Sequence, residues 1–374
     1  MRTQIQIRSL LFAVLLGVGQ AVLAVDDGFA TAVEAYRAQD FSAALQGFRP
    51  LAEAGDPRAQ FALGLLHDNG EGVPQNDREA VRWYEKSAAQ GYAKAQYNLG
   101  VMTLSGRGLP RNDQRAREWF ERAAAQGNPD AIARIVQLAE GGDVEAQYRL
   151  AVMYVKGIAV PQDPTLGYRW MQRAAARGHL DAMFGMGLMT EQGLGVERSY
   201  TAAVNWYVPA SNQGHVKATY NLGRLIRDGL GQPADASRAE RLFEKAAAAG
   251  YVPAQLTLGM LYDQGEGWPR NAARAVAWYR QAAGNGSAEA QINLGYLYAN
   301  GEGLPGDPVE AYARTYAADR LGHPLGAGNL SLIATKLRDA ELRKAQQLGE
   351  RYVSRARSMP SVAQGGSAAE TARP

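Results

Sequence analysis

The four histidines of this chain are the residues best suited to metal binding or proton transfer at neutral pH: His67, His179, His215 and His323. His179 and His215 are 36 residues apart and would lie in adjacent layers of packed helices. Such layers are spaced roughly 10 Å apart, which is too far for two imidazoles to hold one ion without movement. His179, His215 and His323 share the same turn between repeats, so we interpret them as loop residues, and we expect neither a metal ion nor another cofactor.

Two other patterns bear on chemistry. Gly70-Glu71-Gly72 and Gly301-Glu302-Gly303 look like phosphate-binding loops, but such loops follow a strand, whereas these follow predicted helices and recur through the chain. They are read as structural turns. The S-x-x-K, S-D-N and K-T-G motifs of serine β-lactam enzymes are absent from the sequence. We therefore expect no enzymatic activity.

The elements that must position any site come from one 36-residue unit. Seven copies of this unit open on an alanine, with one jump of 51 residues between the second and the third copy. Repeats of this length are typical of solenoids, in which each unit buries its apolar face against its neighbours. The opening residues are Ala59, Ala95, Ala146, Ala182, Ala218, Ala254 and Ala290.

Counting from each opening alanine as position 1, the unit predicts two helices. The first spans positions 1–11 and ends at an invariant glycine at position 12, where a left-handed residue is needed. Position 14 is also glycine, except at Ala159, and a proline usually follows at position 16. The second helix begins after Asn or Asp at position 18, a good N-cap, and carries large residues at positions 25 and 26. The predicted fold is all-α.

Two segments depart from this pattern. Residues 131–145 contain one predicted helix without a second, and Gly141-Gly142 follows the apolar part of that helix. This pattern predicts either a hinge between two repeat blocks or a helix that packs in phase. In the repeat that opens at Ala182, Pro209 falls within the second helix and should kink it or end it early.

The unit resembles the Sel-1-like repeat of the tetratricopeptide superfamily. The resemblance rests on the run AQYNLGVMTLSGRGLPRNDQRAREWFERAAAQG over residues 95–127 and on its recurrence through residues 29–357. It implies a right-handed α-solenoid of helix-turn-helix repeats that holds protein partners, often in bacterial envelopes or at host surfaces.

The chain begins with features of a secretory signal. Arg2 and Arg8 precede an apolar stretch from Leu10 to Val18, and a cleavage site of small residues ends at Ala24. Without these residues the net charge falls from +3 to +1, because 38 basic residues oppose 37 acidic ones, and no basic run suggests nucleic-acid binding. No cysteine is present for a lipid anchor or a disulfide. We expect an exported, periplasmic protein with no integral membrane segment after cleavage.

These observations divide the chain into six parts. They are a signal peptide (1–24), a capping helix pair (25–58), an N-terminal repeat block that ends in the unpaired helix (59–145), a C-terminal block of five repeats (146–326), closing helices (327–357) and a disordered tail (358–374).

The predicted site is the inner face of the first helices. Positions 4, 7 and 11 share one side of a helix, and they vary between repeats and are mostly polar at positions 4 and 11. If they line the concave groove, their amides would bond an extended peptide and their arginines would take acidic groups. The alternative is ordinary solvated surface. The candidate partner-binding residues are Asn98, Ser105, Arg149, Lys156, Asn221, Arg224, Asp228, Asn293, Tyr296 and Asn300.

The predicted function is an exported scaffold or adaptor for protein–protein interactions in the bacterial cell envelope, whose partners are envelope proteins or an extended peptide segment. Two alternatives stay open. One is a secreted virulence factor that binds a host protein, and the other is a β-lactam or cell-wall hydrolase.

Overall fold

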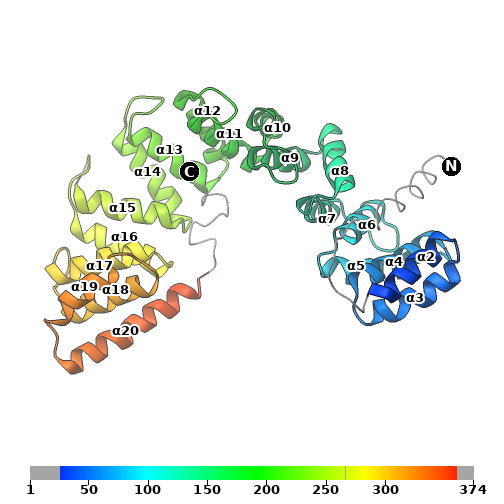
Figure 1. Cartoon of the computed structure of the whole chain (residues 1–374). Helices are drawn as coiled ribbons and strands as arrows, with labels where there is room; N and C mark the ends of the chain where they lie inside the picture. The colour runs from blue at the N-terminus through cyan, green and yellow to red at the C-terminus, as the bar shows by residue number, and fades with distance from the viewer. Residues whose placement is uncertain (1–25, 266, 360–374) are drawn as a thin grey trace. The chain divides into compact units, whose positions relative to one another are not determined.

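The computed structural model describes residues 26–265 and 267–359, and within them it contains nineteen helices and no strand (Figure 1). This confirms the all-α prediction. The helices are α2 (Asp26–Arg37), α3 (Phe41–Glu53), α4 (Pro57–Asn69), α5 (Asp77–Ala89), α6 (Ala93–Ser105), α7 (Asp113–Ala125), α8 (Pro129–Glu140), α9 (Val144–Lys156), α10 (Pro164–Ala176), α11 (Leu180–Gln192), α12 (Tyr200–Asn212), α13 (Val216–Arg227), α14 (Ala236–Ala248), α15 (Val252–Gln264), α16 (Ala272–Gly284), α17 (Ala288–Asn300), α18 (Pro308–Arg320), α19 (Gly326–Ala334) and α20 (Asp339–Arg357).

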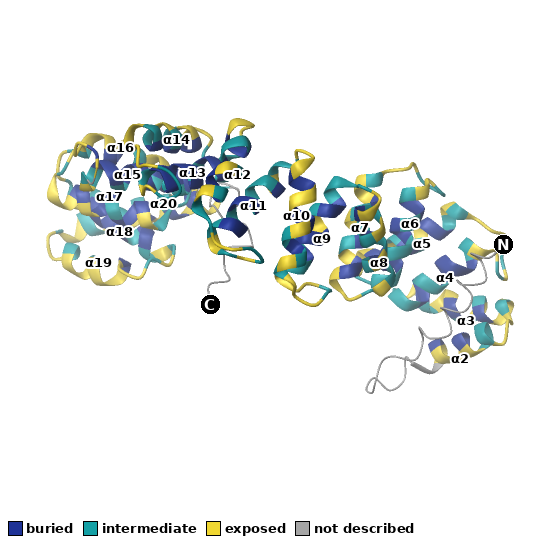
Figure 2. Ribbon diagram, turned by 90° about the horizontal axis from the view of Figure 1, so that it is seen from above, coloured by how far each residue is buried: buried dark blue, intermediate teal, exposed yellow. Residues whose placement is uncertain are grey.

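The chain divides into two compact units, Met1–Trp170 and Met171–Pro374. Within each unit, successive helices pack on one another in chain order, as expected of an α-solenoid. The first unit opens with the pair α2 and α3, and the second closes with α19 and α20, both packed against α18. The helices carry buried residues toward their neighbours and exposed residues toward solvent (Figure 2).

Local sequence explains where these helices begin and end. All six predicted Asn and Asp caps accept a backbone N–H bond at the start of a second helix: Asn76, Asn112, Asp163, Asp235, Asn271 and Asp307. The glycines at position 12 all have a positive φ, between 67° and 78°. The Gly-x-Gly segments are therefore helix-ending turns, as predicted.

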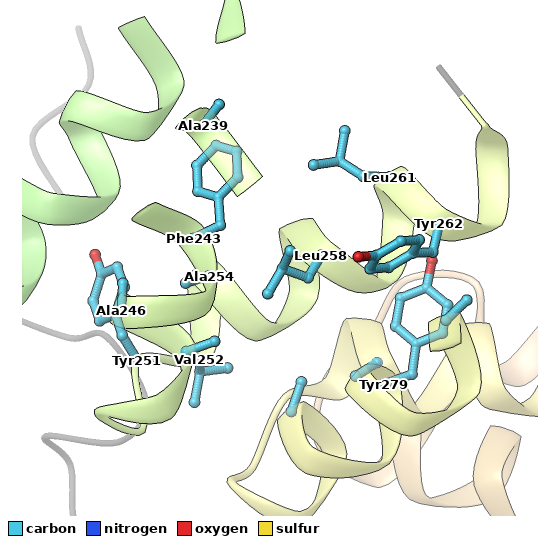
Figure 3. Packing of buried hydrophobic residues seen from close by; sticks show 14 of the residues in the cluster. Ala239, Phe243, Ala246, Tyr251, Val252, Ala254, Leu258, Leu261, Tyr262 and Tyr279 are labelled. Carbon is cyan, nitrogen blue, oxygen red and sulfur yellow. The ribbon is translucent and has the colours of Figure 1, made fainter. Parts of the chain in front are cut away.

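Close crossing of the two helices in a repeat depends on a glycine at position 6 facing a ring at position 26. A Cβ at this glycine would lie 2.2–2.8 Å from the ring in five repeats, so no side chain fits there. The pairs are Gly64–Tyr84, Gly100–Phe120, Gly187–Tyr207, Gly223–Phe243 and Gly259–Tyr279. Figure 3 shows part of the resulting core in the second unit, where Phe243 and Leu258 lie among small and aromatic residues.

In four repeats the glycine at position 14 lies against the first residue of the preceding second helix, whereas Gly267 has no such contact within 4 Å. A Cβ at Gly108 would lie 2.3 Å from the carbonyl oxygen of Asp77, and one at Gly231 would lie 2.5 Å from the carbonyl carbon of Tyr200. Ala159 holds the same left-handed conformation, with a φ of 65°. Its repeat, which begins with α9, comes directly after the single helix α8, so no second helix precedes it for position 14 to approach.

Both departures from the repeat are visible. α8 packs against α7 on one side and α9 on the other, so it occupies the place of a first helix. The division between the compact units falls later, after Trp170, and a hinge at Gly141-Gly142 stays a prediction. Pro209 does not end its helix early, because α12 runs on to Asn212 with the usual 13 residues. Proline has a helical φ and removes only one backbone bond, which a last turn tolerates.

The predicted signal peptide and nearly all of the predicted tail lie outside the described residues. In the range that the structure does describe, no helix is long and apolar enough to cross a membrane.

Candidate partner-binding surface

Three of the predicted amides are bonded between repeats rather than free to meet a partner. Asn98 donates to the hydroxyl of Tyr84 at 3.0 Å, and Asn221 donates to that of Tyr207 at 3.3 Å. Asn293 makes the same kind of bond with Tyr279. Each amide comes from position 4 of one repeat, and each tyrosine comes from position 26 of the repeat before it.

Each of these tyrosines also donates to a carboxylate at position 10 of its own repeat. The distances are 3.3 Å from Tyr84 to Asp68, 2.7 Å from Tyr207 to Glu191 and 3.4 Å from Tyr279 to Asp263. We call this arrangement the Tyr–carboxylate–Asn cluster. It supplies the buried hydroxyl with both an acceptor and a donor, as a buried polar group requires.

The surroundings of the cluster hold the phenol neutral. Burial, followed by the charge of the neighbouring carboxylate, raises the pKa of Tyr84, Tyr207 and Tyr279 well above its ordinary value. Arginines stand beside two of the carboxylates, since Arg107 bonds Asp68 and Arg224 lies 3.4 Å from Glu191. Arg224, another predicted site residue, is therefore part of a contact between repeats.

The three members of the cluster occur together or not at all. Where position 26 is Phe120, position 10 is Leu104 and the following position 4 is Arg134. Where position 26 is Phe243, the other two are Arg227 and Thr257. We call a boundary between repeats closed when it carries the cluster and open when it does not.

One open boundary, in the second unit, holds a pocket of about 560 Å³ between α13 and α15. Thr257, Met260 and Gln264, at positions 4, 7 and 11 of α15, line it together with Asp228. The structure thus brings the three predicted positions to one cavity. Arg227, Ala234, Ala236, Leu261, Gly267 and Trp268 complete the lining.

The polar groups of this pocket are largely satisfied. Asp228 pairs with Arg227 at 2.6 Å, Thr257 lies 3.2 Å from the hydroxyl of Tyr220, and Trp268 donates to Glu240 at 3.3 Å. What remains for a ligand is an apolar and aromatic wall with a neutral amide, Gln264. One repeat further on, at the same position as Met260, Tyr296 is 61% exposed.

Another open boundary, in the first unit, holds a pocket of about 430 Å³ between α6, α7 and α8. Most of its lining residues stand at the same positions of the repeat as those of the pocket between α13 and α15, but their chemistry differs. Ser105 is the one predicted site residue in it, and that hydroxyl bonds backbone carbonyls of its own helix. The other lining residues are Val101, Leu104, Arg111, Asp113, Arg117, Arg134, Leu138 and Asp143.

The remaining predicted residues lie outside both pockets. Arg149 pairs with Glu145 at 2.7 Å and Glu121 at 3.3 Å, and Asn300 donates to Glu302 at 3.3 Å. Lys156 is exposed at the end of α9. Of the ten predicted residues, Ser105 lines one of the two pockets and Asp228 lines the other.

Sequence reasoning missed Arg134, Met260, Gln264 and Trp268. Arg134 could have been found by continuing the 36-residue register from Ala95 to Ala131, which places it at position 4. Met260 and Gln264 stand at the predicted positions 7 and 11 and were left out of the candidate set.

His179 and His215 prove to be the N-cap residues of α11 and α13. Nδ1 of His179 accepts from the N–H of Ala182 at 3.2 Å, and Nδ1 of His215 accepts from that of Ala218 at 3.1 Å. Across residues 26–265 and 267–359, no group of three or more His, Cys, Asp or Glu side chains is placed to hold a metal ion.

Comparison with known proteins gives one family. The Sel1 repeat profile matches residues 57–92, 93–128, 144–179, 180–215, 216–251, 252–287 and 288–313. A crystal structure of a Sel1 repeat protein from Oxalobacter formigenes is 31% identical, with a TM-score of 0.51, over 82% of this chain and 86% of that one.

Two other similarities are weaker. A protective antigen of uropathogenic Escherichia coli strains with an SLR fold is 27% identical over 93% of this chain and 88% of that one, at a TM-score of 0.40. The chitin synthase regulator SKT5 of Saccharomyces cerevisiae is 36% identical over 76 residues, which are 20% of this chain. This match spans only 11% of the regulator's length.

Proposed function

Since the chain belongs to the Sel1 repeat family, we propose that it is an exported scaffold that holds an extended segment of a partner protein at the pocket between α13 and α15. The presence of Sel1 repeats supports a function as a protein-interaction scaffold, and proteins built from these repeats are typically non-catalytic. What we propose beyond this is the binding site, the kind of protein segment that binds there and the compartment in which the protein works.

The observation that carries the site is the pocket itself. Its wall combines Met260, Leu261 and Trp268, side chains that adapt to or anchor an apolar group. Gln264 offers both a donor and an acceptor to a peptide backbone. Tyr296, exposed one repeat further on, supplies an aromatic contact for the continuation of the segment.

The site can be tested by crosslinking in the native host. A photoreactive residue at Gln264 should capture a discrete protein, and Met260→Asp should abolish the capture, because a charge would face the apolar group of the ligand. The same residue at the exposed Gln281 of α16 is the matched control. Equal capture from both positions, or capture that survives Met260→Asp in a protein of normal circular dichroism, would reject the site.

The proposed compartment is the periplasm, supported by the signal-like pattern at residues 1–24. The protein should appear in osmotic-shock fluid with Val25 as its first residue. Recovery from the culture supernatant instead would favour the secreted host-binding alternative. Turnover of nitrocefin by the pure protein would favour the hydrolase alternative.

A further inference from the structure

The pocket of the first unit, between α6, α7 and α8, contains more positive than negative charge. Three arginines and two aspartates line it. Arg111 is paired with Asp113 at 2.7 Å, and Arg117 is paired with Asp143 at 2.7 Å. Two of the three positive charges are therefore compensated within the protein.

Arg134 carries the third positive charge of this pocket. Its guanidinium bonds the neutral side chain of Gln137 within α8, and among the described residues no carboxylate lies within 4 Å of it. Its Nε is buried and has no hydrogen-bond partner, and the same is true of Nε of Arg117. Unsatisfied buried donors are costly, and those on a charged group most of all. The pocket therefore presents one arginine charge, that of Arg134, which no carboxylate of the described residues pairs with.

Apart from Ser105, apolar side chains occupy the rest of the lining. Val101 and Leu104 come from α6, and Leu138 comes from α8 one turn beyond Arg134. A ligand that fits this pocket must present an anionic group beside an aliphatic one. A protein segment with an acidic residue next to a branched aliphatic residue has that chemistry.

We propose that this pocket is a second binding site, in which Arg134 and Arg117 bind the carboxylate of an acidic residue of a partner protein while an adjoining aliphatic side chain packs on Val101, Leu104 and Leu138. A single carboxylate neutralises the one uncompensated charge. A phosphate dianion would leave net negative charge beside Asp113 and Asp143, and it would bring no apolar group to the wall. The site is independent of the pocket between α13 and α15.

Peptide display on the full mature chain tests the proposal directly. Peptides selected by the wild type but not by Arg134→Gln should be enriched in Asp or Glu adjacent to Leu, Ile or Val. The matched control is Arg115→Gln, which removes the same charge from an exposed arginine of α7 outside the pocket. The control should select the same peptides as the wild type.

The best selected peptide should bind Arg134→Gln at least about ten-fold more weakly than the wild type, since a charge-assisted bond is lost. Replacing its acidic residue with the corresponding amide should produce a similar loss. Identical selections with the wild type and Arg134→Gln, both with normal circular dichroism, would overturn the proposal. Displacement of the peptide by inorganic phosphate at equal concentration would identify an unspecific anion site and would overturn it as well.

Discussion

The two pockets arise at equivalent places in the repeat and differ in what they can bind. In the first unit the lining includes three arginines and two aspartates, and in the second it includes Met260, Leu261, Trp268 and a single ion pair. Both lie at boundaries without the Tyr–carboxylate–Asn cluster. The comparison shows that what the two pockets share is the lack of the cluster residues at positions 10 and 26 of one repeat and position 4 of the next. The variable positions around the opening then decide its chemistry.

The largest effect should come from substitution of the glycine at position 14. This residue is present at the regular boundaries and is replaced by Ala159 at the boundary after α8. Gly231→Ala in the second unit should lower the free energy of unfolding by roughly 3 kcal/mol, because the new Cβ meets the backbone of Tyr200 at a positive φ. Ala159→Gly should raise it by about 1 kcal/mol, because it relieves a left-handed alanine. Urea unfolding of both variants measures the contrast. A loss from Gly231→Ala no larger than the gain from Ala159→Gly would show that the contact with the preceding second helix does not explain the glycine.

The next largest effect should come from disrupting the cluster at a closed boundary. Tyr207→Phe should cost about 1–3 kcal/mol, since it leaves Glu191 and Asn221 short of a partner in a buried site. The reverse change at the open boundary, Phe243→Tyr, brings a hydroxyl without a carboxylate at position 10 and should not stabilise the protein. A gain from Phe243→Tyr comparable to the loss from Tyr207→Phe would contradict the view that the cluster acts as a unit.

The same tyrosine gives a pH dependence of known sign. Burial raises the pKa of Tyr207 in the folded state. The contribution of its neutral phenol to the free energy of unfolding is therefore complete below the pKa of the unfolded state, which is about 10, and is lost as the pH rises above that value. The stability difference between the wild type and Tyr207→Phe should therefore shrink above pH 10, by at most about 1.4 kcal/mol per pH unit. Urea midpoints measured between pH 8 and pH 11 (roughly the range in which phenols titrate) check this, and a difference that stays constant would argue against a neutral buried phenol.

The smallest expected change in stability is also the most informative about the open boundaries. Replacing Arg227, Phe243 and Thr257 with Glu, Tyr and Asn installs the cluster between α13 and α15 and should stabilise the protein by about 1 kcal/mol. It should also eliminate crosslinking from Gln264. A triple variant that is folded and still captures the partner would separate the pocket from the state of the boundary.

Much of this architecture could be predicted from the sequence, because the determinants of the helices are local. The caps at position 18 and the glycine turns at position 12 act within a few residues of themselves, and all of them are found as predicted. The register also placed positions 4, 7 and 11 on one face, and one pocket is lined by all three.

The particular residues of the site were harder to predict. Asn98, Asn221 and Asn293 share a face with the pocket residues, but a sequence does not show which hydroxyl of the neighbouring repeat lies opposite. The pattern of large residues at positions 25 and 26 assigns no partner to the hydroxyl of a tyrosine at position 26. Arg134 lies in a segment that departs from the repeat pattern, which hides its place at position 4, although α8 takes the place of a first helix.

Because every boundary is built from two neighbouring repeats, its state belongs to a junction and not to a repeat. A duplicated or exchanged repeat therefore brings positions 10 and 26 to one junction and position 4 to another, without changing a core glycine or a cap. Gene rearrangements that leave the fold intact would create junctions with new combinations of these three residues. The Tyr–carboxylate–Asn cluster thus gives repeat shuffling a route to new binding pockets at little risk to folding.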